Sequence, residues 1–175
     1  MTFNRQDLAV LISDETIQRR VRELAEEISR DYAGKDLALV GILKGSFVFL
    51  SDLSRALSIE CTIDFLGLSS YGHRTTTTGV VQITSDLTSP IEGRDVLVVE
   101  DIIDTGLTMR YLLENLSTRK PSSIKVCTLL HKPSRTKVDV PMHYVGFTIE
   151  DHFVIGYGLD YADKFRNLPF IGWKR

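Results

Sequence analysis

The sequence has little of what marks several common classes of protein. Only two of its 175 residues are cysteines, Cys61 and Cys127, and they form no CxxC pair and have no histidine at zinc-finger spacing. This pattern gives no support for a zinc finger. Because both cysteines lie in apolar, strand-like segments, we expect two buried thiols.

Long apolar runs and a strong net charge are also missing. No stretch of about 18 apolar residues occurs, and residues 1–13 lack a basic region followed by a long apolar one, so neither export nor membrane insertion is expected. The formal net charge of −2 gives no overall attraction to nucleic acid or to an anionic membrane. We therefore expect a cytoplasmic protein whose partners include neither nucleic acid nor a membrane.

The remaining composition, 43% hydrophobic and 25% charged, is typical of one globular domain over residues 1–175. Apolar residues recur at helical spacing after Ser13, a possible helix cap, as far as Gly34. Further on, the patterns predict strands at residues 37–43, 61–68, 80–84, 96–99, 124–130 and 143–149, and helices at 46–57 and 106–116. This alternation predicts an α/β fold with a central parallel β-sheet flanked by helices on both faces.

Residues 96–109, VLVVEDIIDTGLTM, form the most informative segment. Its apolar start predicts a strand buried on both faces, and its TGLT turn predicts the start of a helix. Free amides and the helix dipole at such a start can receive an anion, and Thr105, Gly106 and Thr108 add hydroxyls and room for close approach. No GxxxxGKS or GxxxxGKT segment occurs, so this is not a P-loop. We expect the turn to hold a phosphate monoester.

Three acids lie beside this turn. Glu100 and Asp101 would repel the phosphate, so ribose hydroxyls or Mg²⁺ are their natural partners. Together with the turn they predict a site for a phosphorylated ribose. Asp104 could exchange a proton with a heterocycle on the anomeric carbon, although an aspartate at the start of a helix is also a common helix cap.

The same segment resembles the phosphoribosyl-pyrophosphate signature of type I phosphoribosyltransferases. The segments LVGILKGSFVFLSDL, SSYG, CTLLHKPSR and FVIGYGLDYADKFRNLPFIG resemble, in order and spacing, the hypoxanthine (hypoxanthine-guanine) phosphoribosyltransferase family. This resemblance implies the type I phosphoribosyltransferase fold, with a small hood formed by the N-terminal and C-terminal segments. It also implies Mg²⁺ as cofactor, phosphoribosyl pyrophosphate and a 6-oxopurine base as substrates, IMP or GMP as product, and a homodimer or homotetramer.

Further site residues follow partly from position and mainly from the resemblance. Lys44 and Gly45 end a predicted strand and would bind pyrophosphate, unless they form an ordinary turn with a solvated lysine. Lys132 follows another strand and could donate to the exocyclic oxygen of a 6-oxopurine. The resemblance adds a lid and a C-terminal group: Ser70 and Tyr71 over the substrates, Phe153 stacking on the base, Val154 at its edge, Asp160 near a second Mg²⁺, and Arg166 on pyrophosphate.

Each of these assignments has an alternative. Residues 70–79 have the composition of a hairpin tip, the segment around Phe153 could be core, and Arg166 could be a surface charge. A transferase that prefers xanthine, and a non-catalytic regulator that senses phosphoribosyl pyrophosphate, are the alternative functions. Such a regulator is expected to have lost Asp104 or the base-contacting residues and to carry a basic face.

Overall fold

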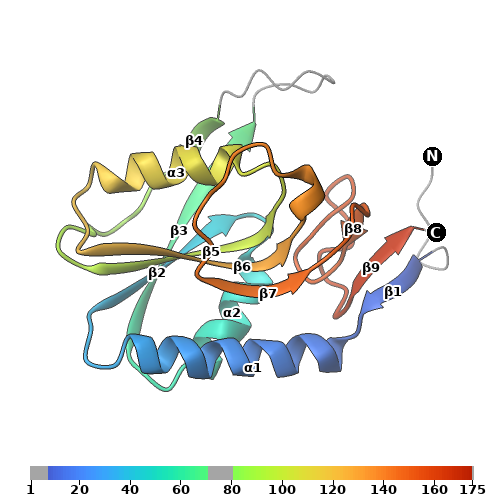
Figure 1. The fold of residues 1–175 in the computed structure, drawn as a ribbon, viewed down its shortest axis with the longest axis horizontal. Helices are drawn as coiled ribbons and strands as arrows, with labels where there is room; N and C mark the ends of the chain where they lie inside the picture. The colour runs from blue at the N-terminus through green and yellow to red at the C-terminus, as the bar shows by residue number, and fades with distance from the viewer. Residues whose placement is uncertain (1–7, 71–80, 175) are drawn as a thin grey trace.

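The main structural element is a six-stranded sheet with the strand order β4-β3-β2-β5-β6-β7 (Figure 1). The computed structural model describes residues 8–70 and 81–174. The strands of this sheet are β2 (Leu37–Leu43), β3 (Cys61–Ser70), β4 (Val81–Ser85), β5 (Asp95–Ile103), β6 (Ser123–His131) and β7 (Tyr144–Thr148). Neighbouring strands are parallel except for β3 and β4, which pair antiparallel. The predicted central parallel sheet is therefore confirmed.

Helices cover both faces of the sheet. Figure 1 shows α1 (Asp14–Asp31) and α2 (Phe47–Ala56) on one side and α3 (Leu107–Ser117) on the other. The side chains of β5 alternate between the two cores, since Leu97 and Val99 pack with α1 and α2 whereas Val96 and Val98 pack with α3. The apolar run of β5 is thus buried on both faces, as its sequence predicts.

The first helix forms for the reasons that its sequence gives. The Ser13 side chain accepts a hydrogen bond from the Thr16 amide at 3.3 Å, and so caps the first turn. The predicted apolar stripe is buried along its whole length: Ile17, Val21, Leu24, Ala25 and Ile28. The helix ends at Asp31, and Gly34 follows with a φ of +74°, a conformation that glycine adopts without strain.

A second, three-stranded antiparallel sheet has the order β1-β9-β8. It consists of β1 (Leu8–Ile12), β8 (Val154–Ile155) and β9 (Ile171–Lys174). The chain also contains a short 3₁₀ helix, η2 (Pro133–Arg135), after β6. Figure 1 shows the small sheet at the end of the main sheet toward which β6 and β7 point. The two terminal segments thus meet beside the carboxyl edge of the main sheet.

Two details differ from what the sequence predicts. Cys127 is buried, but Cys61, the first residue of β3, is only half-buried because a strand end is not enclosed by the core. The strand predicted at residues 96–99 continues to Ile103, because its backbone keeps pairing with β6 beyond the apolar residues. In the described ranges, no helix combines the length and the apolar character that crossing a membrane requires.

Candidate active site at the carboxyl edge of the sheet

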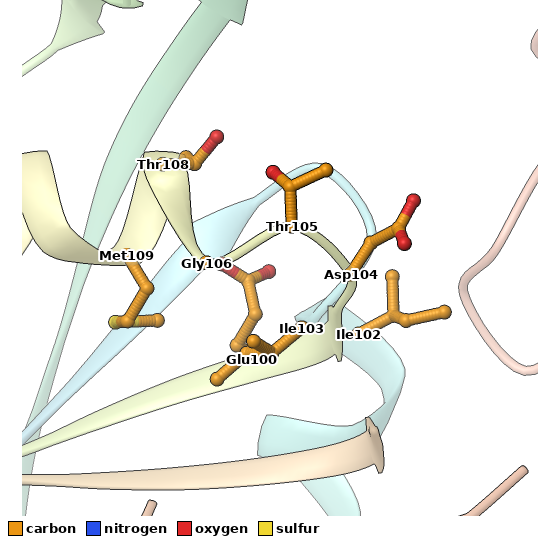
Figure 2. Close-up of a pocket in the computed structure, with 8 residues that line it drawn as sticks. All are labelled: Glu100, Ile102, Ile103, Asp104, Thr105, Gly106, Thr108 and Met109. Carbon is orange, nitrogen blue, oxygen red and sulfur yellow. The ribbon is translucent and has the colours of Figure 1, made fainter. Parts of the chain in front are cut away.

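A hollow of about 100 Å³ lies where β5 passes into α3 (Figure 2). It is lined by residues from the end of the strand, the turn and the first turn of the helix: Glu100, Ile102, Ile103, Asp104, Thr105, Gly106, Thr108 and Met109. The structure therefore brings the predicted phosphate-binding residues of the turn together around one cavity.

Gly106 gives this turn its shape. It is the N-cap of α3 and has a φ of +81°, and a Cβ atom at this position would collide with the Val138 carbonyl oxygen. Gly106 itself has no side chain to cap the helix, and the side-chain hydrogen bond to the first turn, from the Leu107 amide to Thr105 Oγ1, is long at 3.4 Å. The positive end of the α3 dipole faces the hollow, which favours an anion there.

Asp104 precedes the N-cap by two residues and is therefore not the helix cap, which excludes the alternative interpretation of this residue. Its carboxylate points out of the turn in Figure 2 and accepts a hydrogen bond from Arg135 Nε at 3.3 Å. The side chain of Asp104 is 39% exposed. It can therefore meet both solvent and a bound ligand.

Glu100 and Asp101 form a buried pair of carboxylates at the end of β5. Glu100 is 8% exposed, and its carboxylate extends from the strand toward the turn at Gly106 (Figure 2). Loss of water and the neighbouring Asp101 carboxylate raise the pKa of Glu100 well above its ordinary value, and burial also raises the pKa of Asp101. No lysine, arginine or histidine of the described side chains forms an ion pair with either residue. The pair therefore suits a cation or hydroxyl donors supplied from outside the protein.

The Lys44–Gly45 turn, between β2 and α2, contacts Asp101 of this pair. A Cβ atom on Gly45 would collide with the Asp101 carboxylate, and one on Gly158 would collide with the Gly45 carbonyl oxygen. The peptide bond between Leu43 and Lys44 is cis. Three segments distant in sequence thus meet at Gly45, which puts this turn beside Asp101 at the end of β5.

A second charged group lies at the end of β6. The Lys132 side chain is only 9% exposed, and its Nζ lies 3.6 Å from Asp151 Oδ1. Arg135 lies 3.6 Å from the same carboxylate group and also binds Asp104. Sequence reasoning missed Arg135 and Asp151, although Arg135 stands in the CTLLHKPSR segment. Their proximity depends on the loops after β6 and before β8, which the local sequence pattern does not bring together.

The C-terminal segment carries the remaining predicted residues. Phe153 is 58% exposed and contacts Tyr161 edge-to-face, with ring centroids 5.9 Å apart. Val154 is buried in β8. Arg166 Nη2 lies 2.6 Å from Asp160 Oδ1, and Arg166 Nη1 donates to the Gly158 carbonyl oxygen at 2.7 Å. An exposed aromatic face beside a charged loop can bind a planar, polar ligand.

Comparison with known proteins identifies the family. A sequence profile described as "Phosphoribosyl transferase domain" matches residues 12–162. The chain belongs to this family. It is 48% identical to the hypoxanthine-guanine phosphoribosyltransferase of Bacillus subtilis, over 93% of this chain and 91% of the relative. It is 47% identical to the hypoxanthine phosphoribosyltransferase of Escherichia coli K12, over 96% of each chain.

Solved structures agree with this assignment. The crystal structure of a hypoxanthine phosphoribosyltransferase from Staphylococcus aureus superposes with a TM-score of 0.93 at 48% identity, covering 97% of this chain and 93% of that chain. The resemblance and the type I phosphoribosyltransferase fold predicted from the sequence are therefore confirmed. This phosphoribosyltransferase is an enzyme of the pentosyl-transfer class.

The predicted lid and the predicted metal ligands of this phosphoribosyltransferase stay predictions. Ser70 is the last residue of β3, but its side chain and all of Tyr71 lie outside what the structure describes, so the predicted lid is not tested. Among the described residues, no group of three or more histidine, cysteine, aspartate or glutamate side chains is arranged to hold a metal ion. Asp160 therefore does not complete a cage with Glu100 and Asp101.

Proposed function

We propose that this phosphoribosyltransferase transfers the 5-phosphoribosyl group from phosphoribosyl pyrophosphate to hypoxanthine, and also to guanine, in purine salvage. The products are IMP or GMP and pyrophosphate. One observation carries the proposal: the hollow at the start of α3 and the buried Glu100–Asp101 pair are adjacent, while Lys132 directly follows the neighbouring strand β6. A phosphate site, a ribose site and a donor for an exocyclic oxygen thus follow one another along the edge of the sheet.

In this proposal the turn at the start of α3 binds the 5-phosphate. The positive end of the helix dipole and the hydroxyls of Thr105 and Thr108 favour an anion, and Gly106 leaves room for it. The absence of a lysine from the turn, DTGLT, is consistent with a phosphate that must leave with the product.

Glu100 and Asp101 are proposed to bind the ribose hydroxyls and a Mg²⁺ ion. Two buried carboxylates that form no ion pair among the described side chains suit a hard cation that takes oxygen ligands. Mg²⁺ commonly uses one or two carboxylates and completes its shell with water and substrate oxygens, so a third protein ligand is not required. The ion would supply positive charge against the leaving pyrophosphate.

Pyrophosphate is proposed to lie between two segments that contact each other through Gly45 and Gly158. Lys44 and Gly45 contribute the turn before α2, and Arg166 contributes a guanidinium from the C-terminal loop. Asp160, which Arg166 holds at 2.6 Å, would face a second Mg²⁺ on this side. Asp104 would accept the proton from the imidazole nitrogen of the purine as that nitrogen attacks the anomeric carbon.

The base is proposed to bind between β6 and the C-terminal segment. Lys132 would donate to the 6-oxo group, Phe153 would stack on the ring, and the Val154 backbone would meet its edge. An adenine amino group cannot accept from the lysine, so adenine is rejected. Ser70 and Tyr71 would close over the substrates and keep water from the reacting carbon.

The alternative functions have less support. Asp104, Lys132 and Phe153 are all present together with a net charge of −2, whereas a sensor is expected to lose such residues and gain a basic face. The relatives cited above are named for hypoxanthine, alone or with guanine, and not for xanthine. The homodimer or homotetramer that the resemblance implies is a further proposal, which light scattering on the purified protein tests.

A competition assay tests the proposed function. The purified protein receives phosphoribosyl pyrophosphate, Mg²⁺ and an equal mixture of hypoxanthine, guanine, xanthine and adenine, and nucleotide products are separated and quantified. IMP and GMP are expected, with little AMP. Adenine as the preferred base, or no nucleotide at all, would contradict the proposal. The same assay on Lys132→Ala has a matched lysine control, Lys35→Ala, which alters a lysine near the opposite, amino-terminal edge of the sheet. Lys35→Ala should keep the wild-type base preference.

A further inference from the structure

The loop between β8 and β9, residues 156–170, has an unusual backbone. Four of its non-glycine residues adopt the left-handed conformation, in addition to Gly156 and Gly158: Tyr157, Ala162, Asp163 and Phe165. Side chains with a Cβ atom adopt this conformation at a cost in free energy, so contacts elsewhere must hold the loop in place. The loop carries Asp160 and Arg166, which makes its placement relevant to the site.

Hydrogen bonds within the loop fix its shape but not its position. The Tyr157 amide donates to the Leu168 carbonyl oxygen, and the Gly158 amide donates to the Arg166 carbonyl oxygen, both at 2.9 Å. Arg166 also donates from its side chain to the Gly158 carbonyl oxygen. These bonds join the two sides of the loop into one unit.

Tyr157 and Leu159 belong to the same buried apolar cluster as α2, and three further contacts tie this unit to the segment that runs from the Lys44–Gly45 turn into α2. Gly158 packs against the Gly45 carbonyl oxygen, which fixes distance but gives no directional bond. Lys44 lies 3.1 Å from Asp163, but both side chains are at least 70% exposed, and such ion pairs contribute little. The third contact, from the Tyr157 hydroxyl to Asp52 Oδ2 at 2.6 Å, is a hydrogen bond between a buried side chain and a carboxylate.

We call Tyr157, Asp52 and Gln18 the clamp. Gln18 Nε2 of α1 donates to the same Asp52 oxygen at 3.0 Å and holds the carboxylate toward the tyrosine. Tyr157 is only 2% exposed, and burial together with the bond to Asp52 raises its pKa, so the hydroxyl stays a donor at any physiological pH. Hydrogen bonds to charged acceptors are about twice as strong as those between neutral groups. The clamp is therefore the strongest directional link of the three.

We propose that Tyr157 is a positioning residue, whose bond to Asp52 sets the loop with Arg166 against the Lys44–Gly45 turn at the distance that pyrophosphate needs. Asp52 lies on the helix that begins directly after this turn. Both halves of the pyrophosphate site thus take their position from α2. The inference rests on the proposed function, since it assigns the two halves to pyrophosphate.

The test variant is Tyr157→Phe, which removes the hydroxyl and keeps the ring. The expected result is a KM for phosphoribosyl pyrophosphate raised about tenfold, the lower end of the contribution of a hydrogen bond to a charged group. The kcat and the KM for hypoxanthine should stay within about twofold of wild type. Asp52→Ala should raise the same KM, and the double variant should be no worse than Asp52→Ala alone, because Asp52→Ala already removes the bond to Tyr157.

The chain contains a matched control. The Tyr144 hydroxyl donates to Asp31 Oδ2 at 2.6 Å, the same pair of residue types at the same length, between β7 and the last residue of α1. Tyr144→Phe should lower the unfolding temperature about as much as Tyr157→Phe and leave the KM for phosphoribosyl pyrophosphate unchanged. Asp52→Asn, which keeps an oxygen acceptor for the tyrosine, should restore most of the affinity that Asp52→Ala loses.

The outcomes separate this inference from the proposed function. An active wild-type enzyme with an unchanged KM in Tyr157→Phe overturns the inference alone, and so does an equal rise in Tyr144→Phe. If the wild type makes no nucleotide, the proposed function fails, and calorimetric titration with inorganic pyrophosphate and Mg²⁺ then decides whether Tyr157→Phe weakens binding. If Tyr157→Phe does not fold, Asp52→Ala decides by the same KM.

Discussion

Replacing Glu100 by glutamine should make the ligand-free protein more stable than the wild type. With ligand bound, the variant should be less stable than the wild type. Glu100 is buried beside Asp101, and both effects disfavour its charged form and raise its pKa. Glutamine has nearly the same shape and no charge, so Glu100→Gln removes the cost of a buried, like-charged carboxylate. It also removes the charge that we propose for Mg²⁺ and ribose binding.

The sign of the pH dependence follows from the raised pKa. Below the ordinary pKa of a glutamate, the side chain is protonated in both the folded and the unfolded state. The folded wild type then has no buried charge at Glu100 that would lower its stability. As the pH rises through the raised pKa, the unfolded state loses its proton more readily, and the wild type loses stability. The advantage of Glu100→Gln should therefore be near zero at pH 4 and should increase steadily toward pH 8. For a protein of this size, each 1 kcal/mol of this advantage corresponds to about 2–4 °C in unfolding temperature.

Thermal unfolding at pH 4–8 without Mg²⁺ measures this advantage. Glu114→Gln, which alters an exposed glutamate on α3, is the control and should follow the wild type at every pH. With Mg²⁺ and phosphoribosyl pyrophosphate at about one hundred times the dissociation constant, the wild type should gain about 2.7 kcal/mol, which reverses the order of the two proteins. A Glu100→Gln protein no more stable than wild type at pH 8 would refute the reasoning about the buried pair.

Three further substitutions test separate parts of the site. Asp104→Ala should lower kcat by roughly 10² to 10⁴-fold with the KM for phosphoribosyl pyrophosphate nearly unchanged, and steady-state kinetics with an unaltered kcat would remove Asp104 from the chemistry. Lys132→Ala should reduce the preference for hypoxanthine over adenine by about 10-fold to 100-fold, measured as the ratio of kcat/KM values, and a variant as selective as the parent would show that another group recognises the base. Gly106→Ala should destabilise the protein by more than Gly93→Ala does. Both glycines have positive φ, so both variants bear a strain of about 1–2 kcal/mol, but a Cβ meets nothing within 4 Å at Gly93 and the Val138 carbonyl oxygen at Gly106. Equal losses of unfolding temperature would show that the turn before α3 yields without cost.

Sequence patterns predicted those parts of the fold that depend on local periodicity. The strand at Leu37–Leu43 has the predicted bounds, and the stripe of α1 is buried where the spacing places it. The end of β5 was missed because the pattern of apolar residues stops at Val99, whereas pairing with β6 depends on the backbone and continues to Ile103. The polar side chains of Glu100 and Asp101 therefore do not end the backbone pairing between β5 and β6.

Parts of the site that depend on long-range contacts could not be predicted in this way. The acids and the TGLT turn are adjacent in sequence, and their proximity follows from a single strand–helix junction. The contact between Gly45, Asp101 and Gly158 joins three distant segments, and only the glycines hint at the close packing. The bonds of Arg135 to Asp104 and Asp151 likewise depend on how two loops lie against each other.

Calorimetric titration of the purified protein with phosphoribosyl pyrophosphate, with and without Mg²⁺, tests the central claim most directly. The claim is that the start of α3 and the Glu100–Asp101 pair form one site for an activated, phosphorylated ribose. Saturable binding of one molecule per chain that weakens strongly when Mg²⁺ is removed is the predicted result. Absence of binding in the presence of Mg²⁺, in a protein that unfolds cooperatively, would contradict it.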